Sequence, residues 1–513
     1  MKKGFTLLVL VIFIQNFALT QKVDLIVVSP ENPVKRSDTA LRKKLLEWST
    51  TTLTLTPNKL NAAHPSSVNF PGAAKVGFEL KSETFHFIHK KADSSQYNIS
   101  KKFIASYPNL ATWYSTGLYA VAGQPIFVRV PTELYKKQIY LIIGAHSDYL
   151  GLDYAANEDW RRMPGVFSAF VLDSNFRFAS SPFGGLIYLA MAPQEADVET
   201  ELTFKKVVRA PYYQLGSTTI ADWKKQLTLN KAPWGEIASD KVIITLPDSA
   251  LQKLENPEEV LRQWDKILSC ESDLGQLPAP FIRPMRMVVD EHIAAGFMHS
   301  GYPIMILHSP SQGMLSLDII TNPAKLLLPS NGGANWGFFH EIGHNLQNLE
   351  WLFDGTGEVT CNLFALYVFD SLIKTRKGAH GNIEPAYQKK LMQEYFAKGS
   401  NYKNYQEDPF LALIPFMQVQ KQFDWDPFKK AFKWYLEHPS HDFDNINSED
   451  SLYKKANQIK INRFVERLSI EVKRSLVSFF RIWGVPVDTF VDEKLKKYKL
   501  WIPEELKVLE KKN

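Results

Sequence analysis

Short apolar runs separated by turn residues fill the chain between residues 75 and 215. These runs are rich in β-branched and aromatic side chains, and glycines such as Gly117 and Gly123 interrupt them. The clearest runs cover residues 125–130, 138–144, 166–172 and 186–191. Short strands with frequent turn signals are typical of a β-sandwich. The pattern therefore predicts a β-sandwich in this part of the chain.

The pattern changes between residues 217 and 328, where helical periods alternate with strand-like runs. Asn256-Pro257-Glu258-Glu259 has the composition of a helix start, with a capping residue, a proline at the first position and acids in the first turn. Residues 241–246 and 286–289 have the composition of strands. This alternation predicts an α/β module.

Beyond Gly333 the apolar residues follow mostly helical periods. Asp408-Pro409 and Asp426-Pro427 each predict a helix start. Residues 461–483 predict one long helix that ends at Gly484. A β-rich part, an α/β part and a helical part together predict an α+β multidomain fold.

Composition narrows the class of protein. The 513 residues are 45% hydrophobic and 22% charged, which excludes collagen, coiled coils and wholesale disorder. The net charge of +6, from 60 basic and 54 acidic residues, is too small at this length to indicate a nucleic-acid partner. Cys270 and Cys361 are the only cysteines, so a disulfide-rich scaffold and a Cys-rich zinc finger are excluded.

The N-terminus has the composition of a secretory signal peptide. Lys2 and Lys3 precede an apolar run over residues 5–14, and Ala18 and Thr20 occupy plausible positions before a cleavage site. We therefore expect a signal peptide over residues 1–20 and a secreted, extracellular protein. The alternative is a signal anchor, but the run is about half the roughly 20 residues that a spanning helix needs.

No later segment is apolar and long enough to span a bilayer, so we expect no stable membrane span in the mature chain. Asn98-Ile99-Ser100 is the single glycosylation sequon and is consistent with a glycoprotein. The basic residues after Lys494 could contact an acidic partner, although a solvated helix face and tail explain them as well.

The most specific motif is His340-Glu341-Ile342-Gly343-His344. Residues four apart share one face of a helix, so both imidazoles can bind one metal ion while Glu341 reaches a water on that ion. Two unrelated surface histidines are the plain alternative. The flanking residues 336–346 are apolar, however, which predicts a buried helix. Buried histidines and a buried carboxylate need partners, and a metal supplies one.

A second apolar helix is predicted over residues 355–367, with Glu358 near its start. Glu358 follows the first helix after a linker short enough to fold back, so it is the expected third ligand. Asn362 lies one turn further along the same face and could hold a ligating imidazole by a hydrogen bond. Two histidines and one carboxylate suit one Zn²⁺ ion with an open fourth position.

These residues indicate a peptide-bond hydrolysis without a covalent intermediate. A zinc-bound water becomes acidic enough to supply hydroxide near neutral pH. Glu341, as general base, would take the proton and pass it to the leaving amine.

The sequence resembles the enhancin-like zinc metallopeptidases, the sixtieth metallopeptidase family, which includes mucinase-type enzymes. It is most similar to the branch that contains the TRP-channel-associated factors. The resemblance extends over roughly residues 70–487 and rests on short segments that are specific as a set. Besides residues 340–347 and 358–362, they are WYSTGLY at 113–119, GGLIY at 184–188, APYYQLG at 210–216, APWGE at 232–236, MHSGYPIM at 298–305 and FRIWGVP at 480–486.

The resemblance implies a β-sandwich, a gluzincin-type α/β zinc-peptidase domain and a helical C-terminal lobe. Together with the sequence pattern, it predicts the β-sandwich over residues 70–216, the catalytic domain over 217–400 and the helical lobe over 401–513. Residues 21–69 form an N-terminal segment whose structure the sequence leaves undetermined. The resemblance also assigns zinc binding to His340, His344 and Glu358, and the base to Glu341. Enzymes of the family tend to cleave mucin-like, O-glycosylated proteins, so a protein or glycoprotein substrate is expected.

Two functions stay open at this stage. The channel-associated branch is described as intracellular and as regulating a channel's trafficking and gating, whereas this chain begins with an export signal. A non-catalytic interaction protein that retains a zinc site is the alternative to a secreted peptidase. The presence of Glu341 favours the enzyme, because a structural zinc site needs no general base.

Several other residues have both a functional and a plain interpretation. His299 and Tyr302 precede the zinc helix and could contact substrate or stabilise an oxyanion, although packing explains them as well. Gln347 could touch substrate or hold a ligand of the metal. Tyr367 is expected to be a core residue. His146 is expected to be a loop histidine whose ring nitrogens have hydrogen-bond partners, and not a metal ligand.

The two cysteines could pair in an oxidising compartment. Two buried free thiols are favoured, because Cys361 lies in an apolar helix and buried free cysteine is common.

Overall fold

The computed structural model describes residues 23, 25–53, 57–103, 110–151, 155, 157–277, 281–310, 316–440 and 451–507. These fall into two compact units. Unit 1 comprises the described residues of Met1–Asp93, Leu110–Leu261 and Arg283–Thr321, and unit 2 those of Ser94–Asn109, Arg262–Ile282 and Asn322–Asn513. The expected signal peptide lies outside the described residues, and the expected domain boundaries stay predictions.

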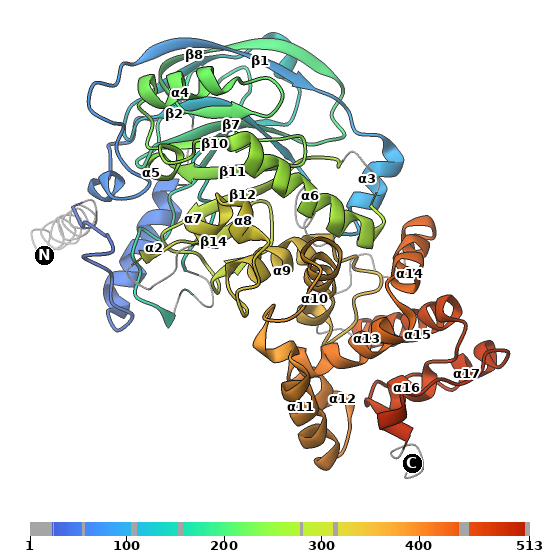
Figure 1. The fold of residues 1–513 in the computed structure, drawn as a ribbon. Helices are drawn as coiled ribbons and strands as arrows, with labels where there is room; N and C mark the ends of the chain where they lie inside the picture. The colour runs from blue at the N-terminus through green and yellow to red at the C-terminus, as the bar shows by residue number, and fades with distance from the viewer. Residues whose placement is uncertain are drawn as a thin grey trace, which may run out of the picture. The chain divides into compact units, whose positions relative to one another are not determined.

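Unit 1 is built on an eight-stranded antiparallel sheet (Figure 1). The strands follow the order β5-β4-β7-β2-β8-β3-β6, and β1 pairs with β8. They are β1 (Lys81–His89), β2 (Thr112–Ala120), β3 (Ile126–Arg129), β4 (Ile139–Ile143), β5 (Ser168–Val171), β6 (Phe178–Ala179), β7 (Gly185–Met191) and β8 (Val198–Arg209).

The long strand β8 joins two halves of this sheet. Most of its length pairs with β1 and β3, whereas its end at Val208 and Arg209 pairs with β2. Every strand contributes side chains to one core, for example Phe87, Ile126 and Leu202, so the sheet wraps around that core. The expected β-sandwich and α+β class are confirmed.

A six-stranded mixed sheet follows in the order β13-β14-β12-β11-β10-β9. The pairs β9–β10, β11–β12 and β12–β14 are parallel. Strands β10 to β12 are almost entirely buried, as expected for parallel strands covered on both faces. The strands are β9 (Tyr212–Gln214), β10 (Trp234–Ala238), β11 (Val242–Pro247), β12 (Met285–Asp290), β13 (Met298–His299) and β14 (Ile304–Leu307).

Strand β7 connects the two sheets of unit 1, because both of its faces are buried. Ile187 and Leu189 point into the sandwich core, and Tyr188 packs in a second core with residues of the mixed sheet such as Val288 and Met305. The helices of this unit are α2 (Thr39–Leu53), α4 (Ile220–Leu229), α5 (Asp248–Leu251), α7 (Leu317–Ile320) and the start of α6 (Pro257–Gly275).

A buried polar network also ties these two sheets together. One carboxylate oxygen of Glu236 accepts hydrogen bonds from the Tyr188 hydroxyl (3.0 Å), Thr245 Oγ1 (3.0 Å) and Arg286 Nη1 (2.8 Å). The Arg286 guanidinium also donates to the Trp113 carbonyl oxygen at 2.9 Å. Trp113, Tyr188 and Glu236 come from three of the segments that carry the family resemblance.

Described residues of the N-terminal segment belong to the same core. Val28, Val34 and Leu45 are buried among the side chains of the second core. The backbone of Val34 also pairs with that of Trp160. The segment over residues 21–69, whose structure the sequence left undetermined, is thus packed into unit 1 where it is described.

Unit 2 is helical, as expected for the residues beyond Gly333. The Asp408 carboxylate accepts hydrogen bonds from the Phe410 and Leu411 amides and so caps α13, which confirms one predicted helix start. The helices are α3 (Ser94–Ser100), α8 (Pro323–Leu326), α9 (Ala334–Leu346), α10 (Gly357–Val368), α11 (Pro385–Ala397), α12 (Tyr402–Gln406), α13 (Pro409–Phe423), α14 (Asp426–Glu437), α15 (Ser451–Val472), α16 (Val477–Ile482) and α17 (Phe490–Leu495). No described helix combines the length and the apolar composition needed to cross a membrane.

The expectation of one long helix over residues 461–483 is wrong. Helix α15 ends at Val472, and α16 begins only at Val477. Lys473 adopts a left-handed conformation (φ 54°), and the backbone of Ser475 forms hydrogen bonds with Lys499 and Trp501. Pairing with this distant segment draws the chain out of the helix.

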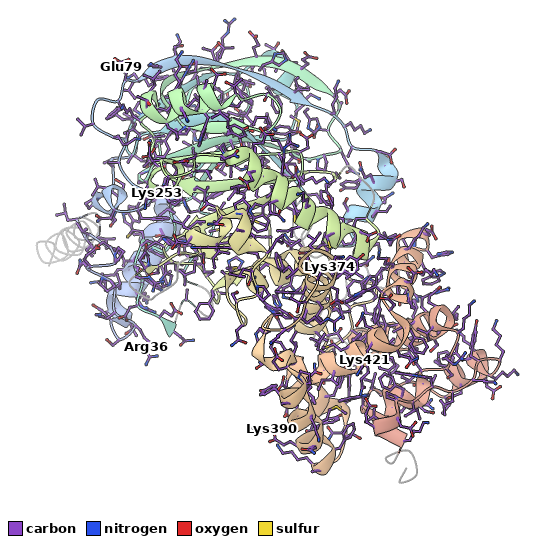
Figure 2. All side chains as sticks on the ribbon, in the orientation of Figure 1. Arg36, Glu79, Lys253, Lys374, Lys390 and Lys421 are labelled. Carbon is purple, nitrogen blue, oxygen red and sulfur yellow. The ribbon has the colours of Figure 1, made fainter. Side chains whose placement is uncertain are left out.

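Charged side chains extend from the ribbon into solvent over both units (Figure 2). Labelled examples, all exposed, are Arg36, Glu79, Lys253, Lys374, Lys390 and Lys421.

Candidate metal centre

Helix α9 carries the His340–His344 motif in unit 2. Its apolar residues, including Phe338, Phe339 and Ile342, are buried, which fixes the rotation of the helix. The two imidazole rings lie on one face with their centroids 4.6 Å apart, as the spacing of four residues predicts. Both rings are mostly covered, with 16% and 12% of their side-chain surface exposed.

Helix α10 brings the third group to these rings. Glu358 lies in its first turn, and its Oε2 is 3.2 Å from His340 Nε2 and 3.3 Å from His344 Nε2. The two helices approach closely because position 343 is glycine. A Cβ atom at Gly343 would lie 2.5 Å from the carbonyl oxygen of Cys361.

A side-chain acceptor holds the far nitrogen of each imidazole. Asn362 Oδ1 lies 2.7 Å from His340 Nδ1, and its amide donates to the Glu358 carbonyl oxygen. Gln347 Oε1 lies 2.8 Å from His344 Nδ1, and its amide donates to Thr360 Oγ1. An amide oxygen thus holds each Nδ1, and each Nε2 faces the Glu358 carboxylate, where a metal ion would take the place of the Nε2 proton.

The structure also places Cys361 beside this group. Its Sγ lies 3.5 Å from Nδ1 and 3.7 Å from Nε2 of His340. One ligand atom from each of His340, His344, Glu358 and Cys361 lies within 4.8 Å of the others. Sequence reasoning treated Cys361 only as a core residue. Its position three residues after Glu358, on the same helix face, was the available signal.

Cys361 is a buried free thiol, as is Cys270, so the expectation of two buried thiols is confirmed. Burial raises the pKa of the Cys361 thiol above its usual value. Without a metal the thiol therefore stays protonated at neutral pH, whereas a metal ion bound to Sγ would deprotonate it.

The Glu358 carboxylate attracts positive charge to this group, either as a proton on an imidazole or as a metal ion. The hydrogen bonds from His340 and His344 hold the pKa of Glu358 well below its usual range, so this carboxylate is ionised. Burial lowers the pKa of His344, but the hydrogen bond that its ring donates to Glu358 and the charges of Glu358 and Glu341 outweigh this effect. Glu341 is 8% exposed, and its influence on His344 and on the Cys361 thiol indicates that it lies near the cluster.

The donor set fits a zinc ion. Two imidazole nitrogens and one carboxylate converge on one point, and second hydrogen bonds fix the rings. This is the ligand set of a zinc site that keeps one position open. Within the described part of the chain, it is the one group of three or more such side chains close enough to hold a metal.

His299 and Tyr302 lie in unit 1, whereas the cluster lies in unit 2. His299 is on the edge strand β13, and its Nε2 lies 2.8 Å from the Asp148 carboxylate. The Tyr302 hydroxyl accepts a hydrogen bond from the Trp113 amide, and the Arg283 guanidinium lies 3.6 Å from its ring centre. Both side chains thus have partners within unit 1, and their contact with substrate stays a prediction.

Two plain interpretations are confirmed. His146 is buried between Phe70 and Trp234, with Nε2 at 3.2 Å from the Val289 carbonyl oxygen. Tyr367 is buried in unit 2.

Two family models match the chain. Residues 206–484 match "Peptidase M60, enhancin and enhancin-like", and residues 92–205 match "N-terminal domain of M60-like peptidases". The first match contains every residue of the metal cluster. Together, the two matches cover the sandwich strands from β2 onward and most of the helical part.

Curated relatives include the TRPM8 channel-associated factors. Factor 1 of Bos taurus is 34% identical over 392 residues, which are 76% of this chain and 39% of that protein. Factor 2 of Mus musculus is 33% identical over 433 residues, covering 83% of this chain and 44% of the relative. The chain thus spans about two fifths of the length of these relatives.

Solved structures share the fold. The IMPa metallopeptidase of Pseudomonas aeruginosa in complex with an O-glycopeptide aligns with a TM-score of 0.60 at 14% identity, over 94% of this chain and 58% of that one. A functionally unknown conserved protein of Bacillus anthracis aligns with a TM-score of 0.58 at 21% identity, over 83% and 80%.

The resemblance expected from the sequence is therefore confirmed by comparisons that span both the sandwich and the metal cluster. The chain belongs to the peptidase family of enhancin and enhancin-like proteins.

Proposed function

We propose that the protein is a zinc-dependent metallopeptidase that hydrolyses peptide bonds. The observation that carries the proposal is the convergence of His340 Nε2 and His344 Nε2 on the Glu358 carboxylate, at 3.2 and 3.3 Å. Glu341, on the same helix, supplies a carboxylate that metal binding does not require. A structural zinc site has no use for such a group.

Each residue has a part in this chemistry. His340, His344 and Glu358 hold the ion, and Asn362 and Gln347 keep the two rings in the tautomer that presents Nε2. A zinc ion held there supplies a Lewis acid that makes a bound water acidic near neutral pH. Glu341 would act as the general base, accepting a proton from the attacking water and returning it to the nitrogen of the leaving amine.

We propose an O-glycosylated, mucin-like protein as the substrate. The Pseudomonas aeruginosa metallopeptidase that shares the fold was solved with an O-glycopeptide, and the family resemblance also implies such a substrate.

The composition of residues 1–20 supports export, so that the protein would meet such substrates outside the cell. Fusing residues 1–23 to a reporter should deliver the reporter to the medium. Retention of the reporter in the cytosol would contradict export.

A non-catalytic regulatory role is the second candidate. It is supported by the 33–34% identity to proteins named as TRPM8 channel-associated factors. In that case the cluster would serve stability alone, and the export signal would have no evident purpose.

The test is a cleavage assay on an O-glycosylated protein and on the same protein after enzymatic deglycosylation. The peptidase proposal expects cleavage of the glycosylated form, loss of cleavage with a chelator, and recovery when zinc is added back. Full zinc occupancy without cleavage of either form, over several substrates, would favour the regulatory role.

A further inference from the structure

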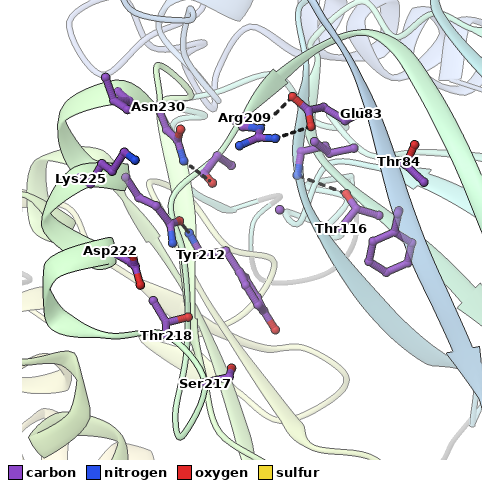
Figure 3. A pocket seen from close by; sticks show the side chains of 16 residues that line it. Glu83, Thr84, Thr116, Arg209, Tyr212, Ser217, Thr218, Asp222, Lys225 and Asn230 are labelled. Atoms are coloured by element: carbon purple, nitrogen blue, oxygen red, sulfur yellow. Dashed lines mark hydrogen bonds and ion pairs between the residues drawn. The ribbon is translucent and has the colours of Figure 1, made fainter.

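A polar pocket of about 580 Å³ lies in unit 1 and shares no residue with the metal cluster. The sandwich strands β1, β2 and β8 form one side of it, and helix α4 forms the other (Figure 3). Its volume is typical of sites for small ligands. The segments 113–119 and 210–216, which carry part of the family resemblance, contribute Thr116 to Leu118 and Tyr212 to its lining.

The charges that line this pocket cancel. Arg209 and Lys225 are its basic residues, and Glu83 and Asp222 are its acidic ones. Arg209 and Glu83 are already paired through two hydrogen bonds, of 2.8 and 2.6 Å. A phosphate or carboxylate ligand would therefore enter without a surplus of opposite charge to offset its desolvation. The balance favours a neutral ligand.

Amide side chains in the pocket are each held by one hydrogen bond and keep a second polar group. Gln226 Oε1 accepts from the Tyr212 amide at 2.8 Å, which leaves the Gln226 Nε2 group outside that bond. Asn230 Nδ2 donates to the Ala210 carbonyl oxygen at 3.0 Å, which leaves its Oδ1 outside that bond. One donor in α4 and one acceptor directly after the end of α4 are thus pre-positioned.

On the opposite side of the pocket, the Arg209–Glu83 pair likewise keeps polar groups that its own two hydrogen bonds do not use. The Arg209–Glu83 pair uses Nε and Nη2 of the guanidinium, so Nη1 takes no part in it. Each Glu83 oxygen also has further lone pairs for a hydroxyl. In Figure 3 this pair lies across the pocket from Asp222 and Lys225.

Aromatic and aliphatic groups complete the lining. Phe85 and Tyr212 are half-buried, and Leu118 is buried nearby on β2. A saccharide ring has apolar C–H faces that pack on such rings, and hydroxyls that both donate and accept hydrogen bonds. Planar carboxylate, amide and guanidinium groups match pairs of neighbouring hydroxyls.

We propose that this pocket binds a neutral saccharide. The saccharide could be free in solution or could be part of a glycan attached to a protein, since both present the same hydroxyls. The site is separate from peptide-bond hydrolysis, so the proposal stands or fails independently of the proposed peptidase.

The experiment uses the full chain and saturation-transfer NMR with galactose, glucose and N-acetylgalactosamine, and with glucose 6-phosphate and inorganic phosphate as charged probes. Ser217→Trp should block the pocket, because Ser217 is exposed and lines it. Thr228→Trp is the matched control, because Thr228 is exposed on α4 and does not line the pocket. Gln226→Leu removes the donor while leaving the space.

We expect at least one neutral sugar to bind wild type and Thr228→Trp with a millimolar dissociation constant. Ser217→Trp and Gln226→Leu should weaken that binding about tenfold or more. Glu341→Gln should bind the sugar as wild type does. The proposal is overturned if no neutral sugar binds the folded wild type, if the charged probes bind better, or if Ser217→Trp binds as well as Thr228→Trp.

A second arm distinguishes the two sources of the saccharide. An O-glycosylated protein and its deglycosylated form are passed over immobilised Glu341→Gln and over the Ser217→Trp/Glu341→Gln double variant. Retention of the glycosylated form by the first protein alone identifies a protein-linked glycan as the ligand. Binding of free sugar without such retention identifies a free saccharide.

Discussion

The side-chain oxygen of Asn362 lies 2.7 Å from His340 Nδ1, while Nε2 of the same ring faces the Glu358 carboxylate at 3.2 Å. One helix, α10, therefore supplies both a ligand and the group that orients another ligand. At the end of α9, Gln347 Oε1 lies 2.8 Å from His344 Nδ1 and orients that ring in the same way. Each imidazole is therefore fixed at both ring nitrogens, by an amide oxygen at Nδ1 and by the Glu358 carboxylate at Nε2.

This arrangement predicts the effect of removing an orienting side chain. Asn362→Ala and Gln347→Ala should each weaken zinc affinity by roughly 10–100-fold, because the ring loses the partner that fixes its tautomer. Titration against a competing chelator measures this. A lower melting temperature with an unchanged zinc affinity would instead make these side chains purely structural.

The close contact at Gly343 predicts a second effect. Gly343→Ala would place Cβ 2.5 Å from the Cys361 carbonyl oxygen, so α9 and α10 must move apart and carry Glu358 away from the imidazoles. We expect a loss of stability of about 1–3 kcal/mol and weaker zinc binding. Thermal unfolding and metal titration measure the two effects.

Gly357→Ala provides the control for this substitution. Gly357 begins α10, and no atom lies within 4 Å of the Cβ that alanine would add. Stability should be unchanged or slightly higher, because alanine favours a helix more than glycine does. Equal behaviour of the two variants would show that the helices are not in the close contact described.

Removing Cys361 distinguishes an open site from a closed one. If the metal has three protein ligands, Cys361→Ala should retain zinc, because the thiol would then be a neighbour of the His340 ring and not a ligand. If Cys361 completes a closed structural site, the same variant should lose most of its zinc. Elemental analysis after gel filtration separates these outcomes, and zinc loss would count against the peptidase.

Glu358→Ala should remove most of the bound zinc, because two imidazoles alone bind weakly. The Glu358 side chain is 66% exposed, so its removal leaves the packed core intact. Metal content by elemental analysis, together with an unchanged β-sheet signal in circular dichroism, checks both statements. Full zinc occupancy in this variant would refute Glu358 as a ligand.

Much of this site could be predicted from the sequence because its geometry is local. The spacing of His340 and His344 is set by the helical repeat, and Glu358 follows within a short linker at the start of the next helix. The proximity of Cys361 to His340 was not predicted, although its spacing from Glu358 contained the signal. An apolar setting made a core residue the simpler interpretation.

Features that depend on contacts between distant segments could not be predicted from local sequence patterns. The break between α15 and α16 results from pairing of Ser475 with the backbone near residue 500, which no periodicity in residues 461–483 reveals. The polar network around Glu236 likewise joins strands far apart in sequence. Strand positions and helix caps such as Asp408, in contrast, follow from local composition.

The most direct test of the central claim is the activity of Glu341→Gln on an O-glycosylated protein. The substitution preserves the shape of the side chain and removes the base, while His340, His344 and Glu358 keep the metal. The account predicts full zinc content, an intact fold and cleavage reduced by at least about 10²–10⁴-fold. Cleavage by Glu341→Gln at the wild-type rate would contradict the account.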